Sequence, residues 1–327
     1  MIKIAIIGAG LSGLSVAHLL KKHSEIILFE KARGVSGRMS TREAQPYSFD
    51  HGAQYFTARS EPFQKFIQPL LAEGVIKRWN ARYVKFDASQ IVERKKWSEE
   101  EPRYVGVPGM NKVAKYLAKG LDIHINTKIE SLKRKKKWEL RDEKGKTYRE
   151  FDWVISTVPS PQVKELFPQN FKYFKDIEAI EMLASFSLML GFDKYIPLDF
   201  EAAHVRNADL SWIAVNSHKP GRKNFFTLMI HSSSAFANAH IDDDREEIMQ
   251  HLLKETSRII GHDVSIADHK AIHGWRYANT TKKNNVSIFL DHNQKLAACG
   301  DWCAGGRVEA SFISAYGLSN AIKQTIL

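Results

Sequence analysis

The 327-residue chain is 43% hydrophobic, which is enough for two domains and a large core. No apolar run approaches the roughly 18 residues of a membrane-spanning helix, and the first apolar stretch lacks the core and cleavage site of a signal peptide, so we expect a globular cytoplasmic protein. Its 48 Lys and Arg against 37 Asp and Glu give a formal net charge of +11, which favours anionic ligands such as phosphorylated cofactors.

Residues 3–38 read KIAIIGAGLSGLSVAHLLKKHSEIILFEKARGVSGR and begin like a nucleotide-binding βαβ unit. An apolar run at 4–7 predicts a strand, three glycines follow in the spacing G-x-G-x-x-G, and residues 14–20 continue as a helix. Such glycines allow a tight turn, close approach of a pyrophosphate and close packing of the helix, while the helix N-terminus attracts the phosphates. The predicted phosphate-binding residues are Gly8, Gly10, Ser12 and Gly13.

A carboxylate stands where the ribose of a dinucleotide is expected. A second predicted strand at 25–29 ends in Glu30, which lies 17 residues beyond Gly13. The acid that accepts from the adenosine ribose hydroxyl usually follows at a distance of about 20 residues. Because the strands, the glycines, the helix and the acid are in register, dinucleotide binding is favoured over a chance glycine turn.

The loop after this acid, KARGVSGR at 31–38, resembles the two-dinucleotide-binding-domain flavoproteins, the group that contains amine oxidases and desaturases. Their pattern is a glycine-rich turn ending in Gly-Arg, although Ser36 here replaces one of the paired glycines. The resemblance implies FAD as the cofactor, with Lys31 beside it and Arg38 at its pyrophosphate. A solvated basic loop would explain Lys31, but it explains the two glycines of the segment less well.

A further segment, FDHGAQYFT at 49–57, looks like the stretch that passes beside the isoalloxazine ring in bacterial renalase-like flavoproteins. The resemblance implies that backbone groups of Gly52, Ala53, Gln54 and Tyr55 bond flavin heteroatoms and tune the ring. We interpret His51 as a structural histidine, because nothing in the sequence places it beside a reacting proton.

Residues 61–159 alternate between helix and strand patterns. Apolar spacing and turn residues predict these elements, namely helices at 61–71 and within 107–117, and strands at 75–86, 91–97, 121–129 and 151–159. The last strand is expected to re-enter the parallel sheet with its carboxyl end at the cofactor. The family resemblance places the backbone N–H and C=O of Ile129 at the adenine.

The densest basic cluster, KRKKK at 133–137, is followed by Trp138. Basic residues beside an aromatic ring could neutralise and stack on nucleic acid. The cluster also opens a predicted hairpin, where lysines protect an exposed edge strand from pairing with other chains. We favour this second interpretation.

Residues 161–284 predict a separate substrate domain. Strand-like runs at 186–192, 210–215 and 225–231 and a helix at 242–260 indicate an antiparallel sheet backed by a helix. The predicted fold is therefore α/β, of the p-hydroxybenzoate hydroxylase and amine oxidase type. Its Rossmann-type FAD-binding domain comprises 1–60, 102–160 and 285–327, and its antiparallel-sheet plus helix substrate domain comprises 61–101 and 161–284.

The C-terminal part repeats the flavoprotein resemblance. A strand at 295–299 leads into Gly300 and Asp301, and a helix is expected at 314–326. In this group a late Gly-Asp places its carboxylate on the ribityl hydroxyls, and the N-terminus of the following helix stabilises negative charge on the flavin. The resemblance therefore adds Asp301, Arg307 and Val308 to the cofactor-binding residues.

Four segments together resemble bacterial renalase-like flavoproteins along nearly the whole chain. They are DHGAQYFTAR at 50–59, SHKPGR at 217–222, HGWRYA at 273–278 and GDWCAGGRVEAS at 300–311. The resemblance implies an FAD-dependent oxidase that converts 2- and 6-dihydroNAD(P) isomers to NAD(P)+ by hydride transfer to flavin N5, with O2 reduced to H2O2. A dihydropyridine nitrogen can expel hydride unaided, so orientation and exclusion of water should carry the catalysis.

We expect four residues to line the substrate face, namely His231, Trp275, Arg276 and Tyr277. An aromatic ring could wall the nicotinamide and Arg276 could meet a phosphate or carboxamide, although each residue has an equally good interpretation as core. Two alternatives stay open: a flavin amine oxidase for a small amine, and an FAD-containing protein that binds nucleic acid through residues 133–137. Cys299 and Cys303 lack the spacing of a redox or zinc motif, so we expect a free buried pair and no metal.

Overall fold

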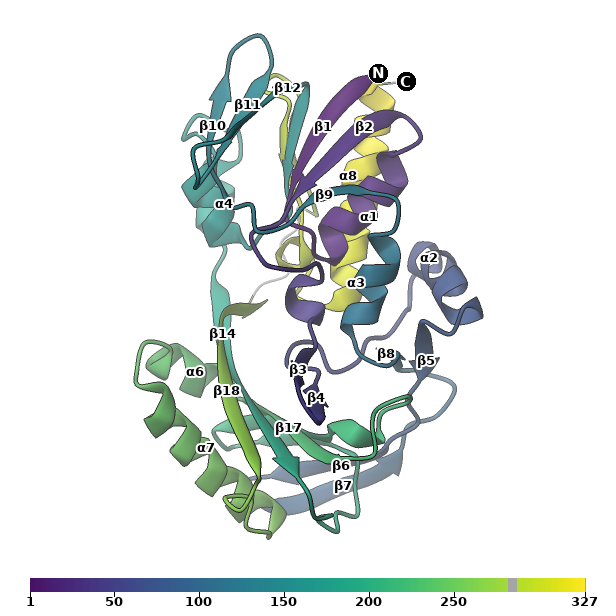
Figure 1. The fold of residues 1–327 in the computed structure, drawn as a ribbon, viewed down its shortest axis with the longest axis vertical. Helices are drawn as coiled ribbons and strands as arrows, with labels where there is room; N and C mark the ends of the chain where they lie inside the picture. Colours follow the sequence, from purple (N-terminus) through teal and green to yellow (C-terminus); the bar gives the residue numbers. More distant parts are fainter. Residues whose placement is uncertain (282–286, 327) are drawn as a thin grey trace.

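A computed structural model describes residues 1–281 and 287–326. Figure 1 shows an upper and a lower sheet, with the long strands β14 (Met182–Phe192) and β18 (His269–Thr280) running between them and both chain ends at the top. The predicted domain boundary at 284/285 and the last residue, Leu327, lie outside the described residues.

The upper sheet has six strands in the order β19-β20-β13-β1-β2-β9. Its five parallel members pair in register, and β19 is antiparallel to β20. Both faces of β1 are buried, as a parallel sheet requires. This confirms the predicted Rossmann-type sheet, whose strands are β1 (Ile2–Ile7), β2 (Ser24–Phe29), β9 (Asp122–His124), β13 (Trp153–Ser156), β19 (Phe289–Asp291) and β20 (Leu296–Ala298).

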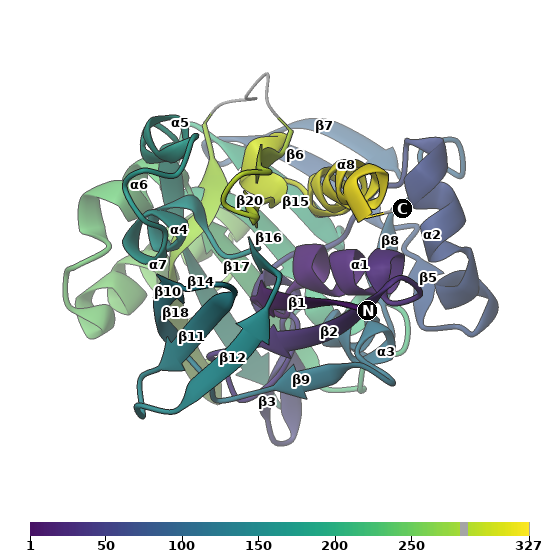
Figure 2. The same cartoon turned by 90° about the horizontal axis from the view of Figure 1, so that it is seen from above.

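Two helices cover one side of this sheet. Seen from above, α1 (Leu11–Leu20) and α8 (Val308–Ile326) lie side by side (Figure 2). The predicted start of the last helix at Ser314 is six residues too late, because the turn at Gly305 and Gly306, with φ of +99° and +73°, already directs the chain into a helix at Val308.

A three-stranded antiparallel sheet is attached to the upper part. It consists of β10 (Ile129–Arg134), β11 (Trp138–Asp142) and β12 (Thr147–Phe151), and α4 (Ser160–Leu166) and α5 (Phe174–Glu178) follow β13. The single strand predicted at 121–129 is wrong: β9 ends at His124, and β10 begins at Ile129. The run at 151–159 likewise splits between β12 and β13, because the chain changes sheets at Asp152.

The lower sheet has seven strands in the order β18-β14-β17-β16-β15-β6-β7. The predicted antiparallel sheet is confirmed for all its pairs except β15 with β6, which are parallel. The parallel pair forms where residues 82–96, from an early part of the chain, join the sheet beside β15. The strands not yet given are β6 (Arg82–Asp87), β7 (Gln90–Lys96), β15 (Ala202–Arg206), β16 (Leu210–Val215) and β17 (Phe226–Ser232).

Two helices, α6 (Ser234–His240) and α7 (Arg245–Ile260), back the lower sheet (Figure 1). The apolar residues Ile248, Leu252 and Ile259 of α7 are buried. The helix starts three residues later than predicted, because Asp244 caps it by accepting hydrogen bonds from the N–H groups of Glu246 and Glu247.

The remaining elements connect the two sheets. They are β3 (Arg42–Ala44), β4 (Tyr47–Phe49), α2 (Glu61–Ala72), β5 (Ile76–Arg78), β8 (Tyr104–Gly106) and α3 (Asn111–Leu117). The predicted helix at 61–71 is confirmed as α2, and it packs on α8 through the rings of Phe63, Phe66 and Phe312. The division of the chain into two domains stays a prediction. The contact between α2 and α8 joins the predicted substrate domain to the predicted FAD-binding domain.

Cys299 and Cys303 are free and buried, as expected. Among the described residues, no helix has both the length and the apolar sequence needed to cross a membrane.

Candidate active site

A cavity of about 1150 Å³ runs from the carboxyl ends of β1 and β2 to the inner face of the lower sheet. The four predicted substrate residues line it, and so do all the predicted cofactor residues except Gly13. The cofactor residues on its wall are Gly8, Gly10, Ser12, Glu30, Lys31, Arg38, Gly52, Ala53, Gln54, Tyr55, Ile129, Asp301, Arg307 and Val308. Segments from across the whole chain therefore meet in one site.

The glycine turn fits a dinucleotide through close backbone packing. Gly8 has a φ of +102°, and its N–H donates to the carbonyl of Phe29 at 2.8 Å. A Cβ at Gly13 would lie 2.0 Å from the carbonyl oxygen of Gly8, so only glycine lets α1 approach the turn. Gly13 thus shapes the site from behind the wall of the cavity.

The Glu30 carboxylate holds this turn together. Its Oε2 accepts from the N–H of Ala9 and its Oε1 from the N–H of Ala32, both at 2.8 Å. Each carboxylate oxygen can accept a second hydrogen bond, so the group retains capacity for a ribose hydroxyl. The hydroxyl of Ser12 donates to the carbonyl of Ser311 at 3.0 Å and ties α1 to α8.

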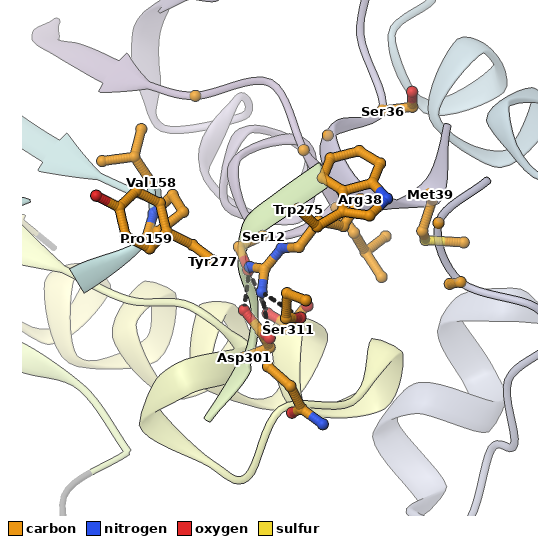
Figure 3. A pocket seen from close by; sticks show the side chains of 18 of the residues that line it. Ser12, Ser36, Arg38, Met39, Val158, Pro159, Trp275, Tyr277, Asp301 and Ser311 are labelled. Carbon is orange, nitrogen blue, oxygen red and sulfur yellow. Dashed lines mark hydrogen bonds and ion pairs between the residues drawn. The ribbon is translucent and has the colours of Figure 1, made fainter. Parts of the chain in front are cut away.

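Arg38 and Asp301 form a bidentate ion pair at the centre of the cavity (Figure 3). Nη1 of Arg38 lies 2.9 Å from Oδ2 of Asp301, and Nη2 lies 2.5 Å from Oδ1. The family resemblance assigned these residues to different parts of FAD, whereas the structure shows them in contact. The pair therefore links the predicted pyrophosphate and ribityl positions.

Residues 52–55 present only some of their backbone groups to a ligand. The N–H of Ala53 donates to the carbonyl of Arg38 at 2.8 Å, and the carbonyl of Gly52 accepts from the side chain of Gln54 at 2.9 Å. Within the described residues, the N–H groups of Gln54 and Tyr55 have no partner. These two donors, on the cavity wall, fit the acceptor atoms of a flavin.

Neutral and aromatic side chains form the substrate end. Tyr55 lies beside Trp212 with 5.6 Å between ring centroids. The indole N–H of Trp275 donates to the carbonyl of His51 at 2.8 Å, and the two rings stack at 5.2 Å. Trp275 is thus held in place as part of the cavity wall, and Tyr277 extends from the same strand (Figure 3).

His231 lies on β17, and its Nε2 is 3.1 Å from Nε2 of Gln54. Burial lowers the pKa of the His231 imidazole to about 3, and the nearby Lys219 and His51 add to this effect. The ring is therefore neutral at physiological pH.

Arg276 is placed differently from the other three predicted substrate residues. Its guanidinium forms an ion pair with Asp242, and both side chains are largely exposed. The Arg276 side chain is thus held against the segment between α6 and α7, whereas the neighbouring Trp275 contacts His51.

Sequence reasoning missed a buried ionic cluster behind the substrate end. Asp50 Oδ2 lies 3.3 Å from Nζ of Lys219 and 2.5 Å from Nη2 of Arg222, and all three side chains are almost fully buried. Burial opposes ionisation of Asp50, but the two cations lower the pKa of its carboxyl to about 2. Residues 219–222 have the sequence of a surface turn, and their only signal in the sequence is the resemblance of the segment SHKPGR at 217–222.

The basic cluster at 133–137 does not fit the nucleic-acid alternative. Trp138 is 2% exposed and packs in the core, so it cannot stack on a base. Lys135 and Lys137 pair with Glu139 and Asp152. The cluster matches the solvated hairpin edge that the sequence favoured.

Comparison with known families places the chain among flavoproteins. The pattern described as flavin containing amine oxidoreductase matches residues 81–316, and that of the NAD(P)-binding Rossmann-like domain matches residues 6–70.

Two curated relatives match parts of the chain. Renalase of Mus musculus is 31% identical over 180 residues, which cover 51% of this chain and 49% of renalase. The prenylcysteine oxidase 1-like protein of Mus musculus is 38% identical over 72 residues, which cover 21% of this chain and 14% of that protein. The chain thus matches about half the length of the first relative and less of the second.

Solved structures share the whole fold. A protein named as a protoporphyrinogen oxidase, from an Exiguobacterium species, has a TM-score of 0.79 at 12% identity over 99% of both chains. Putrescine oxidase bound to putrescine has a TM-score of 0.75 at 14% identity over 98% of this chain and 99% of its own.

Proposed function

This chain belongs to the flavin-containing amine oxidoreductase family, and on that premise we propose that it is an FAD-dependent oxidase whose substrates are the 2- and 6-dihydro isomers of NAD(P). The resemblance of four segments to renalase-like flavoproteins motivates the proposal. The product is NAD(P)+.

The observation that carries the proposal is the lack of acid at the substrate end. The carboxylates on the described cavity wall are Glu30, Glu130 and Glu165 at the adenine end and Asp301 in its pair with Arg38. Within the described residues, β14, β16, β17, β18 and residues 52–55 contribute no acid to the wall. A protonated amine would therefore find no counter-charge, whereas an uncharged dihydropyridine ring needs none.

One set of residues would hold the cofactor, and another would orient the substrate. Residues 8–13, Glu30, the Arg38–Asp301 pair and the N-terminus of α8 would hold FAD, which accepts a hydride when bound and passes the electrons to O2. Trp275 and Trp212 offer flat surfaces for a nicotinamide ring. Arg276, which is half exposed in its pair with Asp242, is proposed to meet a phosphate of the dinucleotide.

The test is anaerobic mixing of the purified holoenzyme with 6-dihydroNAD in a stopped-flow instrument. We expect the flavin absorbance to bleach within seconds and NAD+ to form in equal amount, with ordinary 4-dihydroNAD as the control. A flavin that stays oxidised with both dihydro isomers but bleaches with a small amine would overturn the proposal in favour of amine oxidation.

A further inference from the structure

The side-chain amide of Gln54 is held in one orientation. Its Oε1 accepts from Nζ of Lys219 at 3.0 Å, while its Nε2 donates to the carbonyls of Asp50 at 2.5 Å and Gly52 at 2.9 Å. The reversed amide would place an oxygen against two carbonyl oxygens and an NH2 group against an ammonium. The NH2 group therefore faces His231.

This orientation determines where the His231 proton sits. An amide nitrogen donates hydrogen bonds and does not accept them, so Nε2 of His231, 3.1 Å away, has no acceptor for a proton of its own. A neutral imidazole with an unprotonated Nε2 carries its proton on Nδ1.

The charged and titratable groups around the ring keep it neutral. Lys219 on the loop after β16 and His51 on the loop after β4 both disfavour a positive charge on His231. Asp50, the nearby acid, is already paired with Lys219 and Arg222. No carboxylate of the described residues is thus left to stabilise an imidazolium here.

The other ring nitrogen is available to a ligand. Nδ1 of His231 has no hydrogen-bond partner among the described residues, and it is not enclosed by protein atoms in the way that Nδ1 of His51 is. His231 lies on the cavity wall. Its Nδ1–H is therefore an unused donor at the substrate end.

We propose that Gln54, anchored by Lys219, is a positioning residue that holds His231 as the Nδ1–H tautomer, and that this N–H donates to the carboxamide oxygen of the dihydronicotinamide substrate. The choice of the carboxamide rests on the proposed function, whereas the tautomer does not. A neutral donor suits this reaction because the nicotinamide ring becomes positively charged as it loses hydride, and an imidazolium would oppose that charge.

The first test reads the tautomer directly in the oxidised holoenzyme without substrate. Histidine-selective 15N NMR, with His231 assigned by comparison with His231→Asn, should show a protonated Nδ1 and an unprotonated Nε2 at neutral pH. A protonated Nε2, in either the neutral ring or the imidazolium, would overturn the inference whatever the enzyme oxidises.

Variants of Gln54 test whether this residue sets the tautomer of His231. In Gln54→Glu a carboxylate replaces the NH2 group, so the His231 proton should move to Nε2 and kcat/KM for 6-dihydroNAD should fall about tenfold, the worth of one neutral hydrogen bond. Gln54→Met, which removes the partner without adding a charge, should also lose the fixed tautomer. If the tautomer is unchanged in both, Gln54 does not position the ring.

The ligand contact is tested by a matched pair. His231→Asn can place an N–H near the Nδ1 position, and His231→Gln places one near Nε2; we expect the first to bind NAD+ about tenfold more tightly than the second. Equal binding would overturn the carboxamide contact. Should 6-dihydroNAD fail to reduce the wild-type flavin while NMR shows Nδ1–H, the proposed function falls and the tautomer assignment stands.

Discussion

The two ends of the cavity are built in opposite ways. At the nucleotide end, residues 8–30 supply the turn, the helix N-terminus and the acid from one continuous stretch, and the contacts are largely to backbone atoms. At the substrate end, side chains from four strands and from residues 50–55 converge, supported by a buried ionic cluster. The nucleotide end depends on the close backbone packing that glycine allows, whereas the substrate end depends on ion pairs and hydrogen bonds between side chains.

This difference sets what a substitution can damage. At the nucleotide end an added carbon atom is enough to displace the backbone, whereas at the substrate end the removal of a charge or a proton donor matters more. Substitutions in the two regions should therefore separate loss of cofactor from loss of stability or of substrate recognition.

The largest effect is expected at Gly13. In Gly13→Ala the new Cβ would lie 2.0 Å from the carbonyl oxygen of Gly8, so α1 must move away from the turn. We expect protein without bound FAD and a loss of stability of about 3 kcal/mol or more, measured by the flavin absorbance of purified protein and by urea unfolding. Gly34→Ala is the control, because a Cβ there meets no atom within 4 Å; equal FAD loss in both variants would contradict the account.

The next effect concerns the buried cluster. Asp50→Asn leaves Lys219 and Arg222 without their counter-ion, which should cost about 3 to 5 kcal/mol in urea unfolding. Asp199→Asn removes the partner of Arg94 from an exposed pair and should cause no measurable change. A similar urea midpoint of unfolding for Asp50→Asn and Asp199→Asn would show that the buried cluster does not stabilise the substrate end.

The same carboxyl predicts a pH dependence. The native pKa of Asp50, about 2, is below its ordinary value of 3.8, so the unfolded chain binds its proton more readily. The resulting stabilisation, about 2 kcal/mol, is present above about pH 4 and is lost as the pH falls toward 2. The difference in unfolding free energy between the wild type and Asp50→Asn should therefore shrink by about 2 kcal/mol over this range; a constant difference would contradict the assignment.

The smallest effect is expected at Arg276, whose guanidinium is half exposed and paired with Asp242. Arg276→Ala should leave the melting temperature and the FAD content unchanged and raise KM for 6-dihydroNAD without lowering kcat. A lower kcat would place Arg276 at the reacting ring instead.

The same contrast explains what the sequence could predict. The nucleotide end could be predicted because its key residues, Gly8, Gly10, Gly13 and Glu30, are close in the chain. Their spacing reflects a tight turn and close helix packing, so it predicts the sheet, the turn and the cofactor. The cluster of Asp50, Lys219 and Arg222 depends on residues about 170 positions apart, and the sequence Lys-Pro-Gly-Arg is typical of a solvated turn. Its burial arises only when the lower sheet closes over residues 50–54.

Strand β18 was missed for a related reason. Its residues at 269–280, HKAIHGWRYANT, are mostly only partly buried and mix polar, apolar and aromatic side chains, without the apolar period of a core strand. The long pairing with β14, which places Trp275 and Tyr277 on the cavity wall, is a tertiary contact.

The most direct test of the proposed dihydroNAD(P) oxidation is a single-turnover titration of the oxidised holoenzyme with 6-dihydroNAD in the absence of O2. We predict that one equivalent bleaches the flavin and yields one equivalent of NAD+, and that added O2 restores the flavin with formation of H2O2. A flavin that remains oxidised after several equivalents, in protein that does bleach with a small amine, would contradict it.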